Sequence, residues 1–265
     1  MPTNLDDIQQ ILSLALTTGY VQGERPVNLL VLSFPGAGKS DLLGSFRQWP
    51  SAHYTTYLSF AKLANTYGEA ILQRKIRHFL MPDLSALVER PAGIATAEMA
   101  AWSSLIEEGV MRWQTQRTSV QFPVPHAVGL IACLTRETYA KLESIAPPGF
   151  ISRFLTISYR YSMETARAIH NSIINEDYHG NGLYPAPSLT TRPIKGSPEI
   201  FRRISAENVD RIRHHGDSYG LRTRKHLQTM MKANAMLNHR TTVTPDDYYS
   251  IMLLTKYCNQ TFREI

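Results

Sequence analysis

The chain has 265 residues, of which 43% are hydrophobic and 19% charged, as is typical of a globular protein with a sizeable core. Its formal net charge of +6 permits contact with nucleic acid, but many proteins with such an excess bind none. The longest apolar runs, 27–34 and 127–134, are shorter than the roughly 20 residues of a membrane helix, so we expect no membrane span. The first ten residues carry two acids and no basic residue, which predicts a cytoplasmic location rather than secretion.

The first part of the chain alternates apolar runs with helical patterns. An opening helix is predicted near residues 5–16 from apolar residues at helical spacing. Strands are predicted at 27–34, 53–60, 76–83, 127–135 and 154–162. Helices are predicted at 38–46, 61–74, 96–109 and 163–174, and two short runs at 110–115 and 119–124 predict a hairpin. This alternation indicates a parallel sheet with helices on both faces.

Three segments with different patterns divide the chain. We assign residues 1–180 to an α/β domain and residues 181–197, which are rich in Gly and Pro, to a linker. Residues 198–265 are predicted to form a small all-helical domain, because apolar residues recur at helical spacing in two stretches near 227–235 and 248–255. Thr244, followed by Pro245 and Asp247, is a helix start.

The stretch from Ser33 to Ser40, "SFPGAGKS", lies at the first predicted strand-to-helix junction. At such a junction backbone N–H groups point at a phosphate, and glycines let the backbone approach it closely. Lys39 can reach the β- and γ-phosphates of a nucleotide, and the Ser40 hydroxyl can bind Mg²⁺. Ser33 stands where the full motif has Gly. The predicted nucleotide-binding residues here are Pro35, Gly36, Ala37, Gly38, Lys39, Ser40 and Asp41.

Asp83 follows the third predicted strand. A loop of this kind needs a carboxylate at the end of a neighbouring strand to hold the shell of the Mg²⁺ ion. An Asp after Pro at a strand end is also an ordinary turn, and both interpretations stay open from the sequence. The metal residues that we predict are Ser40 and Asp83, with ATP and Mg²⁺ as ligands.

The order of these parts resembles an AAA+ ATPase, and the details are similar to the branch of the MoxR ATPases and the minichromosome-maintenance helicases. The resemblance covers roughly residues 25–260. It rests on a helix ending in Glu-Glu before a hairpin, the polar end of the strand at 127–135, the "GFISRF" box at 149–154, and the stretch 220–248 with its "VTPDD" ending. It implies a three-layer α/β/α P-loop NTPase sheet followed by a small helical lid.

The resemblance also implies roles for single residues. Thr135 matches the sensor-1 residue near the γ-phosphate. The local sequence fits equally well a Thr that only caps the helix that follows. Arg153 matches the arginine finger, which reaches into the site of a neighbouring subunit. Arg222 is the first choice for the sensor-2 residue, with Arg224 and then Lys225 as alternatives. Tyr20 and Val21 stand where this family contacts adenine.

One part of the family pattern is missing. The strand that ends in Asp83 normally continues with a Glu that polarises the attacking water, and here Leu84 follows. Glu89, Glu107 and Glu108 are the acids that could replace it, but none is placed by the sequence. Hydrolysis could therefore be slow or partner-dependent, and binding of ATP could matter more than its turnover.

Two classes of client stay open. The resemblance implies self-association into a ring, such as a hexamer, or into a helical filament. In the first class the oligomer hydrolyses ATP to grip or remodel DNA through the hairpin tip, with Arg112, Trp113 and Arg117, and through the basic stretch 202–225. In the second it acts on a partner protein as a remodelling ATPase or a slow switch.

Overall fold

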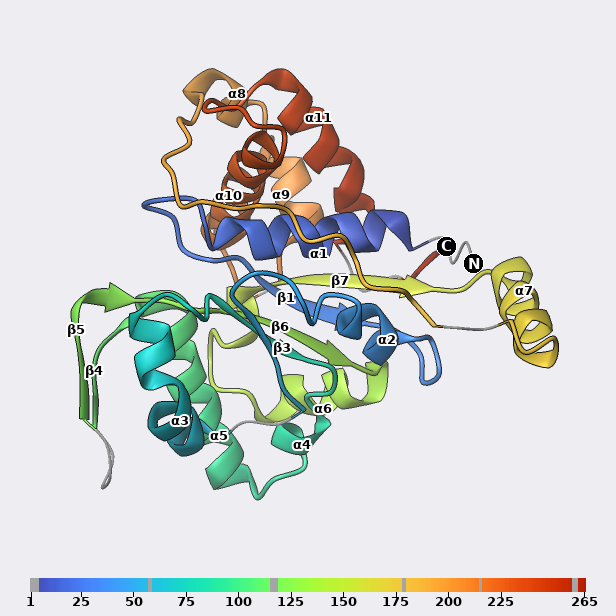
Figure 1. Ribbon diagram of the computed structural model, residues 1–265, viewed down its shortest axis with the longest axis horizontal. Helices are drawn as coiled ribbons and strands as arrows, with labels where there is room; N and C mark the ends of the chain where they lie inside the picture. Colours follow the sequence, from blue (N-terminus) through green and yellow to red (C-terminus); the bar gives the residue numbers. More distant parts are fainter. Residues whose placement is uncertain (1–4, 57–58, 115–118, 178–179, 215, 259–261) are drawn as a thin grey trace.

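The computed structural model describes residues 5–56, 59–114, 119–177, 180–214, 216–258 and 262–265. Its centre is a six-stranded parallel sheet in the order β2-β3-β6-β1-β7-β8 (Figure 1). The strands are β1 (Asn28–Leu32), β2 (Ala52–Tyr54), β3 (His78–Met81), β6 (Gly129–Leu134), β7 (Phe154–Arg160) and β8 (Arg263–Glu264). The two central strands, β1 and β6, are buried on both faces, which explains the apolar run that follows Asn28 in β1 and the apolar sequence of β6.

Helices cover both faces of the sheet, so the fold has the three layers that the sequence predicts (Figure 1). One face packs against α3 (Phe60–Leu72), α4 (Ser85–Val88), α5 (Ala92–Ser103) and α6 (Arg136–Ile145). The other face packs against α1 (Asp6–Thr18), α2 (Lys39–Gly44) and the C-terminal helices. Alternate residues of β1 divide between these two cores, with Leu29 and Val31 in one and Leu30 and Leu32 in the other.

The C-terminal helices form a lid over α1. They are α8 (Pro198–Arg202), α9 (Ala206–Ile212), α10 (Leu221–Leu237) and α11 (Pro245–Leu254), followed by the 3₁₀ turn η3 (Thr255–Tyr257). The lid has no separate core, because α10 packs on α1 and their apolar residues belong to one cluster with the sheet. Beyond η3 the chain returns to the sheet, where β8 pairs in parallel with β7. The expectation of an all-helical segment to residue 265 is therefore wrong at its end.

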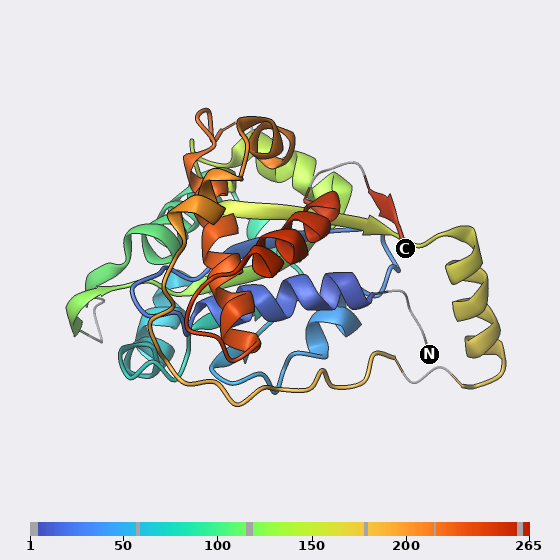
Figure 2. The same ribbon diagram turned by 90° about the horizontal axis from the view of Figure 1, so that it is seen from above.

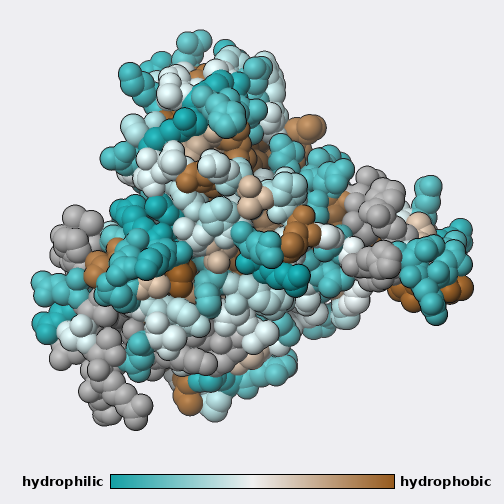
Figure 3. All heavy atoms as spheres, in the orientation of Figure 1, coloured by the Kyte–Doolittle hydropathy of each residue, from teal (hydrophilic) through white to brown (hydrophobic). Residues whose placement is uncertain are grey.

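The helix before the linker lies outside the compact body, whereas the linker packs along its side, with Ile194 buried in the core and Tyr184 stacked on Phe46. Helix α7 (Met163–Ile174) projects beyond the sheet, and the segment 180–197 runs back along the side of the molecule toward the lid (Figure 2). Apolar side chains of α7 are exposed, as Figure 3 shows at that end of the molecule: Met163 at 72%, Ile173 at 53% and Ile174 at 75%. Nothing within the described part of the chain covers them.

The predicted hairpin is present as β4 (Val110–Gln114) and β5 (Ser119–His126). A π-helical turn, η1 (Ser104–Glu108), connects it to α5. Arg112 is exposed, whereas Arg117 and the side chain of Trp113 lie outside the described residues. Among the described helices, none is both long and apolar enough to cross a membrane.

Asp247 fixes the start of α11 and joins it to α10. Its carboxylate is fully buried and accepts hydrogen bonds from the Thr244 backbone at 2.8 Å, Asn234 at 2.8 Å and Arg240 at 2.5 Å. We predict that Asp247→Ala lowers the free energy of unfolding by about 3 kcal/mol, because it removes the cap of α11 and the nearer ion-pair partner of Arg240. Denaturant unfolding measures this, and Asp246→Ala, at an 83% exposed neighbour, is the control expected to change little.

Candidate functional site

The loop between β1 and α2 has the curved backbone of a phosphate-binding loop. Gly36 and Gly38 have φ angles of +75° and +67°, in the region that favours glycine, and Gly38 is the N-cap of α2. A Cβ atom on Gly38 would lie 2.9 Å from the Tyr161 hydroxyl. The two glycines are therefore required by the backbone, and α2 begins with the Lys39 and Ser40 pair that the motif predicts.

Hydrogen bonds to Tyr159 of β7 fix the position of this loop. Ser33, the residue in place of the motif's first Gly, is fully buried, and its hydroxyl donates to the Tyr159 carbonyl at 2.7 Å. The Tyr159 hydroxyl in turn donates to the Ala37 carbonyl at 2.8 Å. The departure at Ser33 thus leaves the loop in place, because its hydroxyl ties the loop to β7.

Lys39 lies inside the curve of the loop. Its ammonium donates to the Ser33 carbonyl at 3.1 Å and to the Phe34 carbonyl at 2.7 Å. Burial lowers the pKa of Lys39, and the nearby groups of Cys133, Asp83 and Glu137 partly offset this. The cation is thus held where the motif places the phosphates, with two carboxylates within its electrostatic reach.

Asp83 follows β3 and faces the same edge of the sheet. Its two oxygens each accept a hydrogen bond at 2.8 Å from Ser85, one from the backbone N–H and one from the hydroxyl. The turn interpretation of Asp83 is therefore confirmed. The metal interpretation stays a prediction for an exposed carboxylate that acts electrostatically on Lys39.

Ser40 and Asp83 fit Mg²⁺ by the chemistry of their oxygens. A hydroxyl and a carboxylate are hard donors, and Mg²⁺ takes one or two protein groups and completes its shell with phosphate oxygens and water. Among the described residues, no three His, Cys, Asp or Glu side chains group as a metal site of their own. The set is thus suited to an ion that arrives with a phosphate.

Thr135 directly follows β6 and lies beside the phosphate loop. The Ser33 N–H donates to the Leu134 carbonyl at 3.3 Å, and Leu32 pairs with Leu134 in the sheet. Thr135 is the N-cap of α6, and its hydroxyl oxygen accepts from the Thr138 N–H at 3.2 Å. The helix-cap interpretation is confirmed, and the sensor interpretation stays a prediction at a position that suits it.

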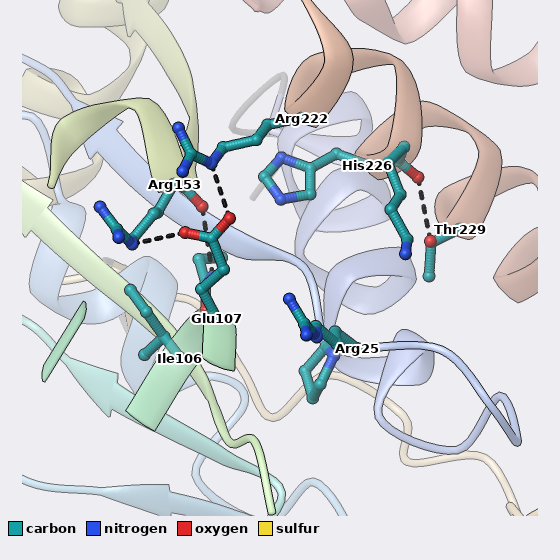
Figure 4. A pocket seen from close by; sticks show the side chains of 10 residues that line it. Arg25, Ile106, Glu107, Arg153, Arg222, His226 and Thr229 are labelled. Atoms are coloured by element: carbon teal, nitrogen blue, oxygen red, sulfur yellow. Dashed lines mark hydrogen bonds and ion pairs between the residues drawn. The ribbon is translucent and has the colours of Figure 1, made fainter. Parts of the chain in front are cut away.

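A second group of charged side chains lies elsewhere, around Glu107 at the end of the π-helical turn (Figure 4). The Arg153 guanidinium contacts one oxygen of Glu107 at 2.5 Å, and the Arg222 guanidinium contacts the other at 2.7 Å. Arg222 also donates to the Ser152 hydroxyl at 3.0 Å. The predicted finger and the first choice for sensor 2 thus share one carboxylate.

This group lines a pocket between the sheet and α10. Figure 4 shows Arg25 and His226 on the opposite wall from Arg153, and Lys225 and Thr229 also border the pocket. Four cationic side chains, Arg25, Arg153, Arg222 and Lys225, therefore surround one carboxylate. Such a pocket has an excess of positive charge and suits an anion.

His226 is the titratable group of this pocket. Its Nδ1 atom is buried without a hydrogen-bond partner in the described part of the chain. Burial lowers the pKa of His226 to about 4, with Arg222 and Lys225 adding to the effect and Glu107 and Asp217 opposing it. The ring is therefore neutral at pH 7.

We predict that protonation of His226 destabilises the fold in acid. The unfolded chain gains a proton near pH 6.5 and the folded chain only near pH 4, so stability is full above pH 6.5 and falls between these values. The His226→Gln variant is expected to lose less stability between pH 6.5 and pH 4 than the wild type, by about 2 kcal/mol in the free energy of unfolding, allowing for partial exposure of the ring. Unfolding in denaturant from pH 8 to pH 4 measures it, and His170→Gln on the exposed face of α7 leaves the slope unchanged.

The two groups lie at opposite ends of β1. The phosphate loop follows Leu32, whereas Asn28, the first residue of the strand, borders the pocket of Arg153 and donates to the Arg153 carbonyl at 3.2 Å. Five residues of a strand span about 16 Å. Arg153 and Arg222 are thus separated from Lys39 within the chain.

A solved protein shares this fold. The crystal structure of a "putative ATPase" from Cytophaga hutchinsonii matches with a TM-score of 0.54, covering 94% of this chain and 80% of that chain at 14% sequence identity. The two proteins thus share a fold, which in this chain is a parallel sheet between two layers of helices with a helical C-terminal region. No family model matches it, and no curated protein matches it.

Within this fold, Tyr20 and Val21 are not close to the loop between β1 and α2. Both are buried, and the Tyr20 hydroxyl donates to Ser51 at 3.0 Å while Arg77 lies over its ring at 4.4 Å. Ser51 and Arg77 precede β2 and β3, at the edge opposite the loop. The adenine contact assumed for these two residues is not supported by their position.

Sequence reasoning missed Glu137 as a neighbour of Lys39 and Glu107 as the partner of two arginines. Glu137 had a local signal, because it is an acid two residues after the end of a strand that was expected beside the loop. Glu107 had none, since it is separated from Arg222 by 115 residues. The structure places Glu107 beside Arg153 and away from Lys39, so it does not replace the missing glutamate. Arg224 lies two residues beyond Arg222 on α10 and does not border the pocket.

Proposed function

We propose that this protein binds ATP with Mg²⁺ and hydrolyses it, as an AAA+ type ATPase. The observation that carries the proposal is the position of Lys39, whose ammonium lies inside a glycine-dependent loop at the end of the central strand. Asp83 reaches the same edge from β3. A cation after β1 and a carboxylate after β3, two strands of the same sheet with β6 between them, are groups that phosphoryl transfer from a nucleotide requires.

The chain's own residues would act mainly by position and charge. The loop backbone and Lys39 would bind the β- and γ-phosphates, and Ser40 with Asp83 would hold the Mg²⁺ ion, which supplies charge neutralisation when bound. Thr135 would contact the γ-phosphate side of the site, and the pairing of Leu134, the residue before it, with Leu32 supports this role. Because little covalent chemistry is left to the protein, correct placement of these groups determines the rate.

We infer that the active site is shared between two copies. Arg153 and Arg222 lie about 16 Å of strand away from the phosphate loop of their own chain, so they do not serve it. A head-to-tail contact would bring them to the phosphates of a neighbour and would generate a ring or a filament. The uncovered apolar residues of α7 are compatible with such a contact.

For the client we propose DNA, with a partner protein as the alternative. The exposed Arg112 on the β4–β5 hairpin favours DNA. The basic stretch 202–225 favours it less than the sequence suggested, since three of its arginines are paired with acids: Arg203 with Glu199, Arg213 with Asp210, and Arg222 with Glu107.

The experiment is to measure ATP turnover and oligomer size together, with and without DNA and at several salt concentrations. Binding of DNA that needs ATP and weakens steeply with salt would support the DNA client. Indifference to DNA, with an ATP-dependent complex with a protein instead, would support the alternative. Absence of both ATP binding and turnover would contradict the proposal.

A further inference from the structure

The P-loop lacks the usual carboxylate that polarises water, because the residue after Asp83 is the buried Leu84. A general base or water-orienting group must come within about 3 Å of the water, directly or through one further water. If the proposed hydrolysis takes place, another acidic side chain has to reach the γ-phosphate side of the loop. The described residues allow the candidates to be compared.

Most acids near this region are occupied elsewhere. Glu107 is held by Arg153 and Arg222 at the opposite end of β1. Asp83 accepts two hydrogen bonds from Ser85 and is the candidate for holding the metal ion. Asp41 faces the segment at Gly180, whose Cβ position lies 3.4 Å from its carboxylate.

Glu137 is placed differently. It lies in the first turn of α6, two residues after Thr135. The strand that leads into this helix, β6, pairs directly with β1. A backbone hydrogen bond from the Ser33 N–H to the Leu134 carbonyl holds the end of β6 against the loop. Helix α6 therefore begins beside the proposed phosphate site. Its side chain is exposed rather than packed away.

The Glu137 carboxylate interacts with Thr135 and, electrostatically, with Lys39. Its pKa lies below the usual value because its own backbone N–H and the Thr135 hydroxyl donate to it, with smaller effects from the cations of Arg136 and Lys39. It is therefore ionised at neutral pH, the state that accepts a hydrogen bond from water. Lys39 and Glu137 are near enough for each to shift the pKa of the other.

We propose that Glu137 is the carboxylate that orients the attacking water, in place of the missing glutamate. This rests on the proposed ATP hydrolysis. The water oxygen forms the new bond to the γ-phosphorus, the bond to the β,γ-bridging oxygen breaks, and ADP leaves with that electron pair. One proton of the water passes to Glu137 and then to phosphate or solvent. Thr135, which donates to Glu137, is the positioning residue for this carboxylate.

The test is Glu137→Gln, which keeps the size of the side chain and its place in the helix but cannot accept the proton. We expect phosphate release to fall about 100-fold, as for loss of a general base, while the affinity for a fluorescent ATP analogue stays within about threefold. Glu207→Gln is the matched control, because Glu207 is likewise an exposed acid in the first turn of a helix, and its turnover is expected to stay normal. Glu89→Gln tests the competing acid on the segment after Asp83.

The outcomes separate this inference from the proposed function. If the wild type releases phosphate in a Lys39-dependent manner and Glu137→Gln is as fast, the assignment of Glu137 is wrong and the proposed function stands. If Glu89→Gln is the slow variant, the base is Glu89. If the wild type binds ATP but releases no phosphate, hydrolysis is absent and Glu137 has no catalytic role. Thermal unfolding of each variant confirms that the change has not disturbed the fold.

Discussion

Lys39→Ala is expected to abolish ATP turnover, with at least a 100-fold loss of phosphate release and a clear loss of nucleotide affinity. The ammonium is the single cation that the structure places inside the phosphate loop, within the described residues, and it is held there by the Ser33 and Phe34 carbonyls. Removal of one such charge from the site of a phosphoryl transfer costs a factor of about 10²–10³ in rate. Phosphate release and titration with a fluorescent ATP analogue measure the two effects.

Lys141→Ala is the control for this variant. Lys141 is an exposed lysine on α6 and has no side-chain contact that ties it to the loop, among the residues described. Loss of the Lys39 ammonium removes only two bonds to the loop's own carbonyls, so the fold is expected to remain. Turnover by Lys39→Ala at the wild-type rate would exclude the loop as the site of hydrolysis.

The sequence was sufficient for the sheet and the loop because both are encoded locally. Apolar runs marked β1, β3, β6 and β7, and the glycines at 36 and 38 marked a loop with positive φ angles. Strand β8 was missed because two residues at the end of the chain carry no period that could reveal pairing. The contacts of Tyr20 and Val21 could not be predicted for a related reason, since position along the chain before β1 does not say toward which end of the sheet a side chain turns.

The charged contacts were the part that the sequence could not predict. Glu107 contacts Arg153 and Arg222 only in the folded protein, where the sheet and the lid come together. The spacing of these residues in the sequence therefore does not predict the contact. Glu137 was visible, but an acid in the first turn of a helix is favoured by the helix itself, and the sequence gives no reason to prefer a role in catalysis. Only the register between β1 and β6 places it beside the loop.

Arg153→Ala is expected to lower turnover about 10³-fold in the assembled protein while ATP binding stays normal. The guanidinium offers a fixed fork of donors to charge on a phosphate, and loss of an arginine finger has an effect of this size. In the single chain the same fork contacts Glu107 at 2.5 Å. Arg203→Ala is the control, because Arg203 is a 40% exposed arginine of the lid paired weakly with Glu199 at 3.8 Å.

A mixing experiment tests whether Arg153 acts on a neighbour. Lys39→Ala subunits keep Arg153, and Arg153→Ala subunits keep Lys39, so a mixed oligomer contains interfaces in which both groups are intact. We expect the mixture to regain part of the turnover that each variant has lost alone. A mixture no faster than the two variants separately would place Arg153 outside the neighbour's site, and normal turnover by Arg153→Ala would remove it from catalysis.

Glu107 sets a condition on this result. It forms ion pairs with Arg153 and Arg222 in the single chain, so a neighbour's phosphate would have to displace the Glu107 carboxylate before the arginines could act. Glu107→Gln removes that competitor and keeps the shape of the turn before β4. It is therefore expected to strengthen assembly in the presence of ATP, and analytical ultracentrifugation of Glu107→Gln beside the wild type measures the shift. A shift of the same size without nucleotide would show that Glu107 acts on assembly independently of the phosphate.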